Sequence, residues 1–187
     1  RQMCIRDRSY IDWLSERVAP PTVTSAQLGL RRFFRFLVDE QDIASDPSAK
    51  IKLVRFRVAP QPTYSPSEIS QLLASCDQST ANGVRDRAIV TVLFDTGVRV
   101  GELVSMALPD RINRTVTVKG KTGIRIVPLG DTSLVEIQRY QRRWRLTSGP
   151  LWRGKKGKIN ESGVFQMIRR LSRRAEVEFK GVHAFRR

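Results

Sequence analysis

Five charged side chains in the second half of the sequence could together act on a phosphodiester. Arg99 and Glu102 are three residues apart, Lys121 lies in a short glycine-containing stretch, and His183 and Arg186 are again three residues apart. Two guanidinium groups can hold the non-bridging oxygens of a phosphate by paired hydrogen bonds while negative charge builds up. A lysine can protonate the leaving oxygen, and a histidine can bond to the phosphate or exchange a proton with a nucleophile. The set therefore suits displacement at phosphorus without a metal ion.

Two consecutive helices are expected to position Arg99. The hydrophobic residues 88–94 stop at Thr96 and Gly97, and apolar residues then recur at helical spacing from Val100. Gly97 suits the left-handed position at the end of the first helix. Arg99 would then lie at a helix–helix corner, within reach of Glu102 one turn later. Taken alone, this pair is also what an ordinary surface ion pair looks like.

A β-hairpin is expected to carry the lysine. Residues 115–118 and 124–127 alternate with a period of two, and a five-residue connection with two glycines joins them. Lys121 lies in that connection, and Lys119 lies two residues before it. Because side chains two residues apart on a strand point the same way, the register does not decide between the two lysines.

Basic residues are concentrated at the end of the sequence. The formal net charge is +16, and residues 139–187 hold 15 Lys and Arg against 3 Asp and Glu. A helix over residues 134–145 and a last long helix, capped by Asn160, would present many of them. Such a surface attracts polyanions, nucleic acid first and an anionic membrane second. The arginines expected on the outer face of the last helix are Arg169, Arg170, Arg173 and Arg174.

Several classes of protein are excluded by the composition. No apolar run approaches the roughly 20 residues that span a bilayer, and no signal peptide is visible. Cys4 and Cys76 are far apart, and the chain has one histidine, so neither a disulfide framework nor a cysteine- or histidine-rich metal site is expected. We therefore expect a reducing, cytoplasmic location with no metal, no cofactor and no membrane partner.

The N-terminal part is expected to form a small helical domain over residues 9–58. Residues 1–8 show no period and are interpreted as a non-native end. Tyr10, Trp13, Leu14 and Val18 mark one helix, which Pro20 should end. A second helix, capped by Thr22 or Thr24, would bury Leu30, Phe33, Phe34 and Leu37. Its other faces carry three arginines that could lie along a phosphate backbone or form a solvated basic face: Arg31, Arg32 and Arg35.

A proline-containing linker over residues 59–63 should lead to a second domain over residues 64–187. Ser65, Pro66 and Glu68 have the spacing of a helix start with a capping box. Asn82 and Gly83 should break the chain before the buried helix that leads to Arg99. The whole is expected to be mainly α-helical, with one small β-hairpin.

The motifs resemble those of the tyrosine recombinases of the phage integrase family, from about residue 9 to the end. The resemblance rests on the run Thr96-Gly97-Val98-Arg99-Val100-Gly101-Glu102-Leu103, on Gly120-Lys121-Thr122-Gly123 leading through Arg125 to Val127-Pro128-Leu129, and on His183-Ala184-Phe185-Arg186 as the H-x-x-R motif. Each motif alone is weak, but their order and spacing are specific to the family.

The resemblance implies a helical core-binding domain of the SAM-like kind, followed by an α+β catalytic domain. It implies Arg99, Lys121, His183 and Arg186 as catalytic residues, with Glu102 supporting the first arginine. Duplex DNA is the implied partner, and intact family members act as homotetrameric synapses. Contacts to DNA are expected from the basic residues Arg31, Arg32, Arg35, Lys119, Arg125, Arg169 and Arg173.

The nucleophile is where the chain departs from the family pattern. The family's attacking tyrosine, which forms a 3′-phosphotyrosine, follows H-x-x-R, whereas Tyr10, Tyr64 and Tyr140 all precede His183. We therefore expect a fragment truncated at its C-terminus, with an incomplete catalytic domain and no activity of its own. The alternatives are a non-catalytic DNA-binding module, a relative of the type IB topoisomerases and, least favoured by the motifs, a merely basic structural protein.

Overall fold

The computed structural model describes residues 2–55, 57, 60–120, 123–154 and 157–186, with side chains from residue 9 onward. The chain divides into two compact units, Arg1–Pro60 and Gln61–Arg187. Most of the elements are helices, and there are two small antiparallel hairpins besides them. This confirms the predicted fold class, mainly α-helical with a small β component. Within these ranges no helix is both long enough and apolar enough to cross a membrane.

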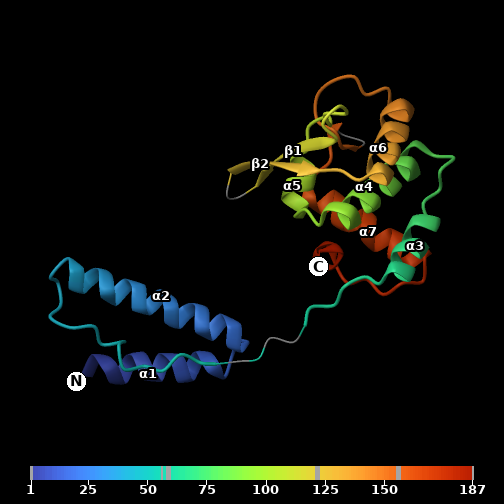
Figure 1. The fold of residues 1–187 in the computed structure, drawn as a ribbon. Helices are drawn as coiled ribbons and strands as arrows, with labels where there is room; N and C mark the ends of the chain where they lie inside the picture. Colours follow the sequence, from blue (N-terminus) through green and yellow to red (C-terminus); the bar gives the residue numbers. More distant parts are fainter. Residues whose placement is uncertain (1, 56, 58–59, 121–122, 155–156, 187) are drawn as a thin grey trace. The chain divides into compact units, whose positions relative to one another are not determined.

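The first unit contains two helices that lie side by side, α1 (Gln2–Ser15) and α2 (Pro20–Asp39) (Figure 1). Residues 2–8, interpreted from the sequence as a non-native end without a period, belong to α1. Pro20 was expected to end a helix, but it begins α2. A proline suits the first turn because its missing N–H would have no partner there. Thr22 and Thr24 consequently lie inside α2 and do not cap it.

The predicted apolar faces of these helices are only partly buried. Ile11, Val23 and Phe34 are buried, whereas Phe33 is 54% exposed. Tyr10 and Trp13 are also exposed, and their rings stack on each other with centroids 6.0 Å apart. A two-helix unit has too little interior to cover every aromatic side chain of both helices.

Residues 51–54, which follow the first two helices, are bound to α2. The Gln27 amide donates to the Lys52 carbonyl at 3.1 Å and accepts from the Val54 N–H at 2.8 Å. Arg31 donates to the Ile51 carbonyl, so this arginine is already engaged within the first unit. The chain leaves α2 only after Val54.

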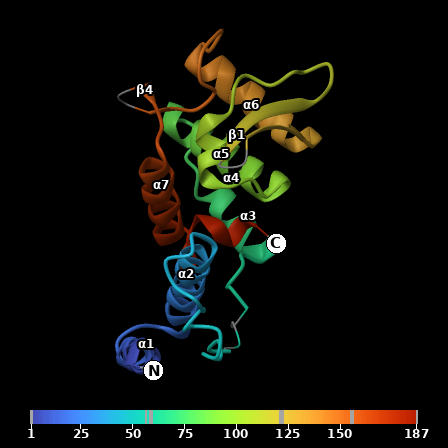
Figure 2. The ribbon, with the colours of Figure 1, turned by 90° about the vertical axis from the view of Figure 1, so that its left-hand side faces the viewer.

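The second unit is built around α4 (Ala81–Thr96), which is surrounded by the other helices (Figure 2). Residues 88–93 of α4 are all buried, as expected for a helix that is apolar on every side. Around it lie α3 (Pro66–Ala74), α5 (Val100–Ser105), α6 (Asp131–Trp144), α7 (Glu161–Arg174) and the 3₁₀ turn η1 (Val182–Phe185). The caps predicted at Ser65, with its capping box, and at Asn160 are confirmed.

The N-terminus of α4 differs from the prediction. The helix begins at Ala81, with the Thr80 hydroxyl accepting the Gly83 N–H at 3.0 Å, so Asn82 and Gly83 lie within the first turn. A Cβ on Gly83 would come within 1.8 Å of the Asp77 carbonyl oxygen. This glycine therefore permits close packing of two backbones and does not break the helix.

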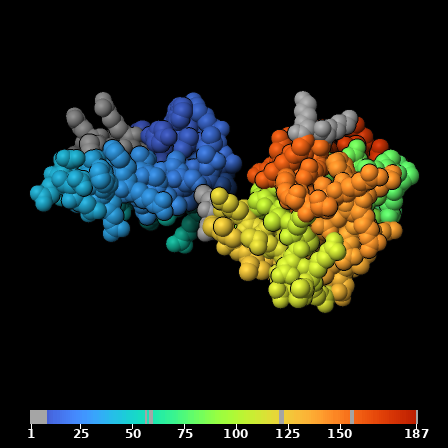
Figure 3. All heavy atoms as spheres, turned by 90° about the horizontal axis from the view of Figure 1, so that it is seen from above, coloured from blue at the N-terminus to red at the C-terminus, as the bar shows by residue number. Residues whose placement is uncertain are grey.

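Two hairpins complete the second unit. Strands β1 (Thr115–Gly120) and β2 (Gly123–Pro128) pair antiparallel, with Thr115 opposite Pro128 and Gly120 opposite Gly123. These strands are longer than predicted, and the hairpin lies on the outside of the unit (Figure 3). A second, shorter antiparallel pair is formed by β3 (Arg153–Gly154) and β4 (Gly157–Lys158).

Candidate active site

The corner between α4 and α5 places Arg99 at the start of a helix. Gly97 ends α4 in the left-handed conformation, with φ of 57°, as predicted. Arg99 is the N-cap of α5, and its backbone N–H donates to Glu102 Oε2 at 2.8 Å. Only this half of a capping box is possible, because a guanidinium group has no acceptor to offer the helix N-terminus.

Glu102 is a buried anion held between two arginines. Its side chain is 3% exposed. Arg125 Nε and Nη2 donate to its two oxygens at 3.1 and 2.9 Å, and Arg99 Nη1 lies 3.4 Å from Oε1. The hydrogen bonds from Arg125, followed by that from the Arg99 N–H, lower the pKa of Glu102 to about 2 against the opposing effect of burial. The same pairing raises the pKa of Arg125.

The arrangement leaves the Arg99 guanidinium available. Arg125 takes the close two-point contact with Glu102, while Arg99 makes one long contact and remains 54% exposed. Glu102 thus fixes the backbone of Arg99 more tightly than its side chain. A guanidinium group oriented in this way can still offer most of its N–H groups to an anion.

The turn end of the hairpin is fixed to the same corner. A Cβ on Gly120 would lie 3.0 Å from Glu102 Oε1, so this glycine lets β1 approach the buried carboxylate. The Lys119 N–H donates to the Ser105 hydroxyl at 2.7 Å, and that hydroxyl donates to the Glu102 carbonyl at 2.7 Å. The last residues of β1 are therefore held at a defined point beside Arg99.

The register separates Lys119 from Arg125. Lys119 pairs with Ile124, and Val118 pairs with Arg125, so the two basic side chains lie on opposite faces of the hairpin. Lys119 is on the exposed face, away from Glu102. Lys121, the lysine assigned to catalysis from the sequence, lies outside the described residues.

The second arginine of the predicted set approaches the same corner from the end of the chain. The Arg186 Cγ lies 3.7 Å from the Cβ position of Gly97, two residues before Arg99. Arg186 and Arg125 both line an open depression of about 490 Å³, together with Asp95. His183 is exposed on the 3₁₀ turn η1, and the exposed Arg186 follows as the C-cap residue of that turn. Arg186, from the predicted catalytic set, and Arg125, from the predicted DNA contacts, therefore line the same hollow.

The remaining predicted DNA contacts lie on helices α2 and α7. Arg32 and Arg35 are exposed on α2 of the first unit, and Arg31 is partly buried there. Arg169 and Arg173 are exposed on α7 of the second unit, and their placement on its outer face matches the prediction.

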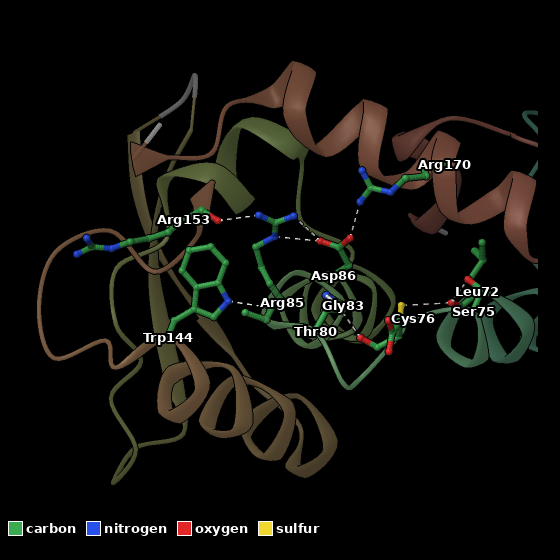
Figure 4. Close-up of polar contacts among 12 residues, drawn as sticks. Leu72, Ser75, Cys76, Thr80, Gly83, Arg85, Asp86, Trp144, Arg153 and Arg170 are labelled. Carbon is green, nitrogen blue, oxygen red and sulfur yellow. Dashed lines mark hydrogen bonds and ion pairs between the residues drawn. The ribbon is translucent and has the colours of Figure 1, made fainter. Parts of the chain in front are cut away.

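A second charged cluster joins α4 to α7 and to the short hairpin (Figure 4). Buried Arg85 donates twice to Asp86 Oδ1, at 2.9 and 2.7 Å, and once to the Arg153 carbonyl at 3.0 Å. Arg170 donates to the other Asp86 oxygen at 2.6 Å. Arg170, expected to face outward, is therefore half-exposed and tied to the core of the second unit. Beside this cluster, burial raises the pKa of the Cys76 thiol to about 12.

Sequence reasoning missed two contacts that shape the site. It named Arg125 as a DNA contact and did not predict that this arginine pairs with Glu102. The available signal was that Arg125 lies on the same face of β2 as the buried Val127, which places it toward the interior. It also missed that Lys180 pairs with Glu68, because the two residues are separated by 112 positions and each has an ordinary local explanation.

The fold and this corner define the class of protein. The chain belongs to the phage integrase family, whose family model matches residues 63–187. It is similar to the tyrosine recombinase XerD of Pseudomonas putida, with 36% identity over 141 residues that cover 73% of this chain and 47% of that protein. XerD of Vibrio cholerae is 32% identical over 142 residues, covering 74% and 47% of the two chains. The chain thus spans about half the length of these curated relatives.

Solved structures support the fold. A lambda integrase dimer bound to a COC′ core site aligns with a TM-score of 0.74 and 15% identity, covering 96% of this chain and 66% of that one. The XerA recombinase aligns with a TM-score of 0.58 and 21% identity, covering 97% and 65%. At these identities the likeness concerns the fold alone.

Proposed function

We propose that the second unit binds duplex DNA and activates a phosphodiester for site-specific recombination. Arg99 and Arg186 would hold the non-bridging oxygens of the scissile phosphate, and His183 would hydrogen-bond to it. Lys121 would protonate the leaving 5′ oxygen, in a reaction that proceeds through a 3′-phosphotyrosine without a metal ion. Glu102 would position Arg99 from behind, and Arg125, which pairs with Glu102, also lines the hollow beside Gly97. The observation that carries the proposal is that Arg186 approaches Gly97, two residues before Arg99, while the exposed Arg99 guanidinium is backed by the buried carboxylate of Glu102.

The three tyrosines of this chain are unsuited to attack. The hydroxyl of Tyr64 accepts the Lys180 N–H at 3.0 Å, and that of Tyr140 accepts the Arg153 N–H at 2.8 Å; both side chains are buried. Tyr10 lies in the first unit, stacked on Trp13. We infer that these 187 residues carry the phosphate-binding groups and not the nucleophile. The same observation favours the second candidate function, a DNA-binding module that does not cut.

A two-part experiment tests the proposal. A fluorescent duplex of about 30 base pairs should bind the chain with strong salt dependence. No covalent adduct between the duplex and the chain should be seen on denaturing electrophoresis. Inorganic phosphate should shift the imidazole resonances of His183, the one histidine of the chain. Arg99→Ala and Arg186→Ala should abolish that shift while most duplex binding remains.

Arg169→Ala serves as the matched control, because it removes an exposed arginine of α7 that does not line the hollow beside Gly97. This variant should keep the phosphate-dependent shift of His183. An adduct mapped to any of the three tyrosines, or a His183 resonance that ignores phosphate, would refute the proposed function. The tetrameric synapse remains a prediction for the intact recombinase.

A further inference from the structure

The segment that carries His183 and Arg186 needs external support. It is the four-residue turn η1, too short to be stable by its own hydrogen bonds. Val182, Ala184 and Phe185 are buried, while His183 and Arg186 point outward. The precision with which the two functional side chains are held therefore depends on what grips the buried residues between them.

Tyr64 contacts residues 180–185 at three points. Its backbone N–H donates to the Ala184 carbonyl at 3.1 Å. Its ring packs on that of Phe185, with centroids 4.7 Å apart. Its hydroxyl accepts the Lys180 N–H at 3.0 Å, just before the turn begins. Backbone, ring and hydroxyl of one buried residue thus bracket the turn.

The side chain of Lys180 adds further contacts between this segment and residues 63–68. Its Nζ donates to both carboxylate oxygens of Glu68, at 2.6 and 2.8 Å, and to the Thr63 carbonyl at 3.1 Å. It also lies 5.7 Å from the centroid of the Tyr64 ring. Glu68 in turn accepts the Ser65 N–H at 2.7 Å as part of the capping box of α3. An ion pair therefore joins the first turn of α3 to Lys180, just before η1.

We propose that Tyr64 is a positioning residue, which sets the placement of His183 and Arg186 through its contacts with residues 180–185. This inference rests on the proposed function, since it assigns Tyr64 a role in presenting the phosphate-binding side chains. It also gives this tyrosine a task other than nucleophilic attack. The ion pair between Lys180 and Glu68 supports the same segment. Its loss should also disturb the placement of His183 and Arg186, to a smaller extent.

Tyr140 provides a matched control. It is also a fully buried tyrosine whose hydroxyl accepts a backbone N–H, that of Arg153 at 2.8 Å. Its ring neighbours are Trp144 and Trp152. Tyr64→Phe and Tyr140→Phe therefore remove the same kind of hydrogen bond, but only Tyr64→Phe removes it from the His183 segment.

The experiment records the imidazole resonances of the full chain during a titration with inorganic phosphate. The wild-type protein should give a saturable shift. Tyr64→Phe should move the resonances of free His183 and weaken phosphate binding about two- to tenfold, because the turn then has to be ordered on binding. Tyr140→Phe should leave both unchanged despite a similar loss in urea midpoint.

Lys180→Met keeps the proposal testable if Tyr64→Phe folds poorly, since it leaves the ring and hydroxyl of Tyr64 in place. It should also weaken phosphate binding, by a smaller factor. If wild-type His183 responds to phosphate but both variants bind it as the wild type does, Tyr64 has no positioning role. If wild-type His183 does not respond at all, the proposed function itself fails.

Discussion

The buried carboxylate of Glu102 should make the stability of the second unit depend on pH. Its pKa falls from an ordinary value of 4.5 to about 2 because Arg125 and the Arg99 N–H stabilise the charged form. At 1.36 kcal/mol for each pH unit, this corresponds to about 3 kcal/mol. Both arginine side chains are about half-exposed, so solvent screening reduces the expected contribution to about 2 kcal/mol.

The sign follows from the lowered pKa in the folded state. Above about pH 4.5, Glu102 is ionised both folded and unfolded, and its full contribution is present. As the pH falls from 4.5 toward 2, the unfolded chain takes up the proton first, so the contribution is progressively lost. The free energy of unfolding should therefore decrease over this window, and Glu102→Gln should lack this part of the decrease.

Urea denaturation at a series of pH values measures the difference. In a Trp13→Phe background, fluorescence reports on the second unit through Trp144 and Trp152. Glu102→Gln should cost about 2 kcal/mol at pH 6 and almost nothing at pH 2. Subtracting the two titrations cancels the contribution of Glu68, whose pKa is also lowered to about 2.

The control is Glu178→Gln, which changes an exposed glutamate of the same unit and should shift stability by less than about 0.5 kcal/mol. A Glu102→Gln titration that runs parallel to the wild type from pH 6 to pH 2 would show that Glu102 is not held as a buried anion. The account of how Arg99 is positioned would then be wrong.

Three further predictions concern other parts of the second unit. Asp86→Ala should reduce the free energy of unfolding by about 3–5 kcal/mol, because it leaves a buried arginine unpaired; a urea midpoint equal to that of the wild type would contradict this. In a Cys4→Ser background, Cys76 should not react with a thiol reagent at pH 8 until urea unfolds the chain, since burial raises its pKa to about 12. Removing Arg169 and Arg173 together should lower the slope of log affinity for duplex DNA against log salt by about 2, and an unchanged slope would place the DNA elsewhere.

The parts of the fold that the sequence predicts are those governed by local chemistry. The capping box at Ser65, the cap at Asn160 and the left-handed Gly97 each depend on a few neighbouring residues, and each is confirmed. The helix–helix corner at Arg99 follows from the last of these. The hairpin also follows from its alternating pattern, because that pattern specifies both the pairing and the buried face.

The parts that the sequence does not predict depend on contacts between distant segments. Gly83 has the appearance of a helix breaker, and only the closeness of Asp77 shows why a glycine lies inside α4. Arg125 has the appearance of a free surface charge until Glu102 is placed beside it. Local patterns say which residues are basic, but not which of them are already neutralised.

The attachment of residues 180–185 to residues 63–68 has a consequence for chimeric recombinases. Thr63, Tyr64 and Glu68 come directly after the junction at residues 60 and 61, yet they hold the end of the chain that carries His183 and Arg186. A chimera that exchanges the first unit for another module should therefore be joined before residue 61. A fusion point chosen at the start of α3 would leave the new module well folded and the phosphate-binding turn without its anchor.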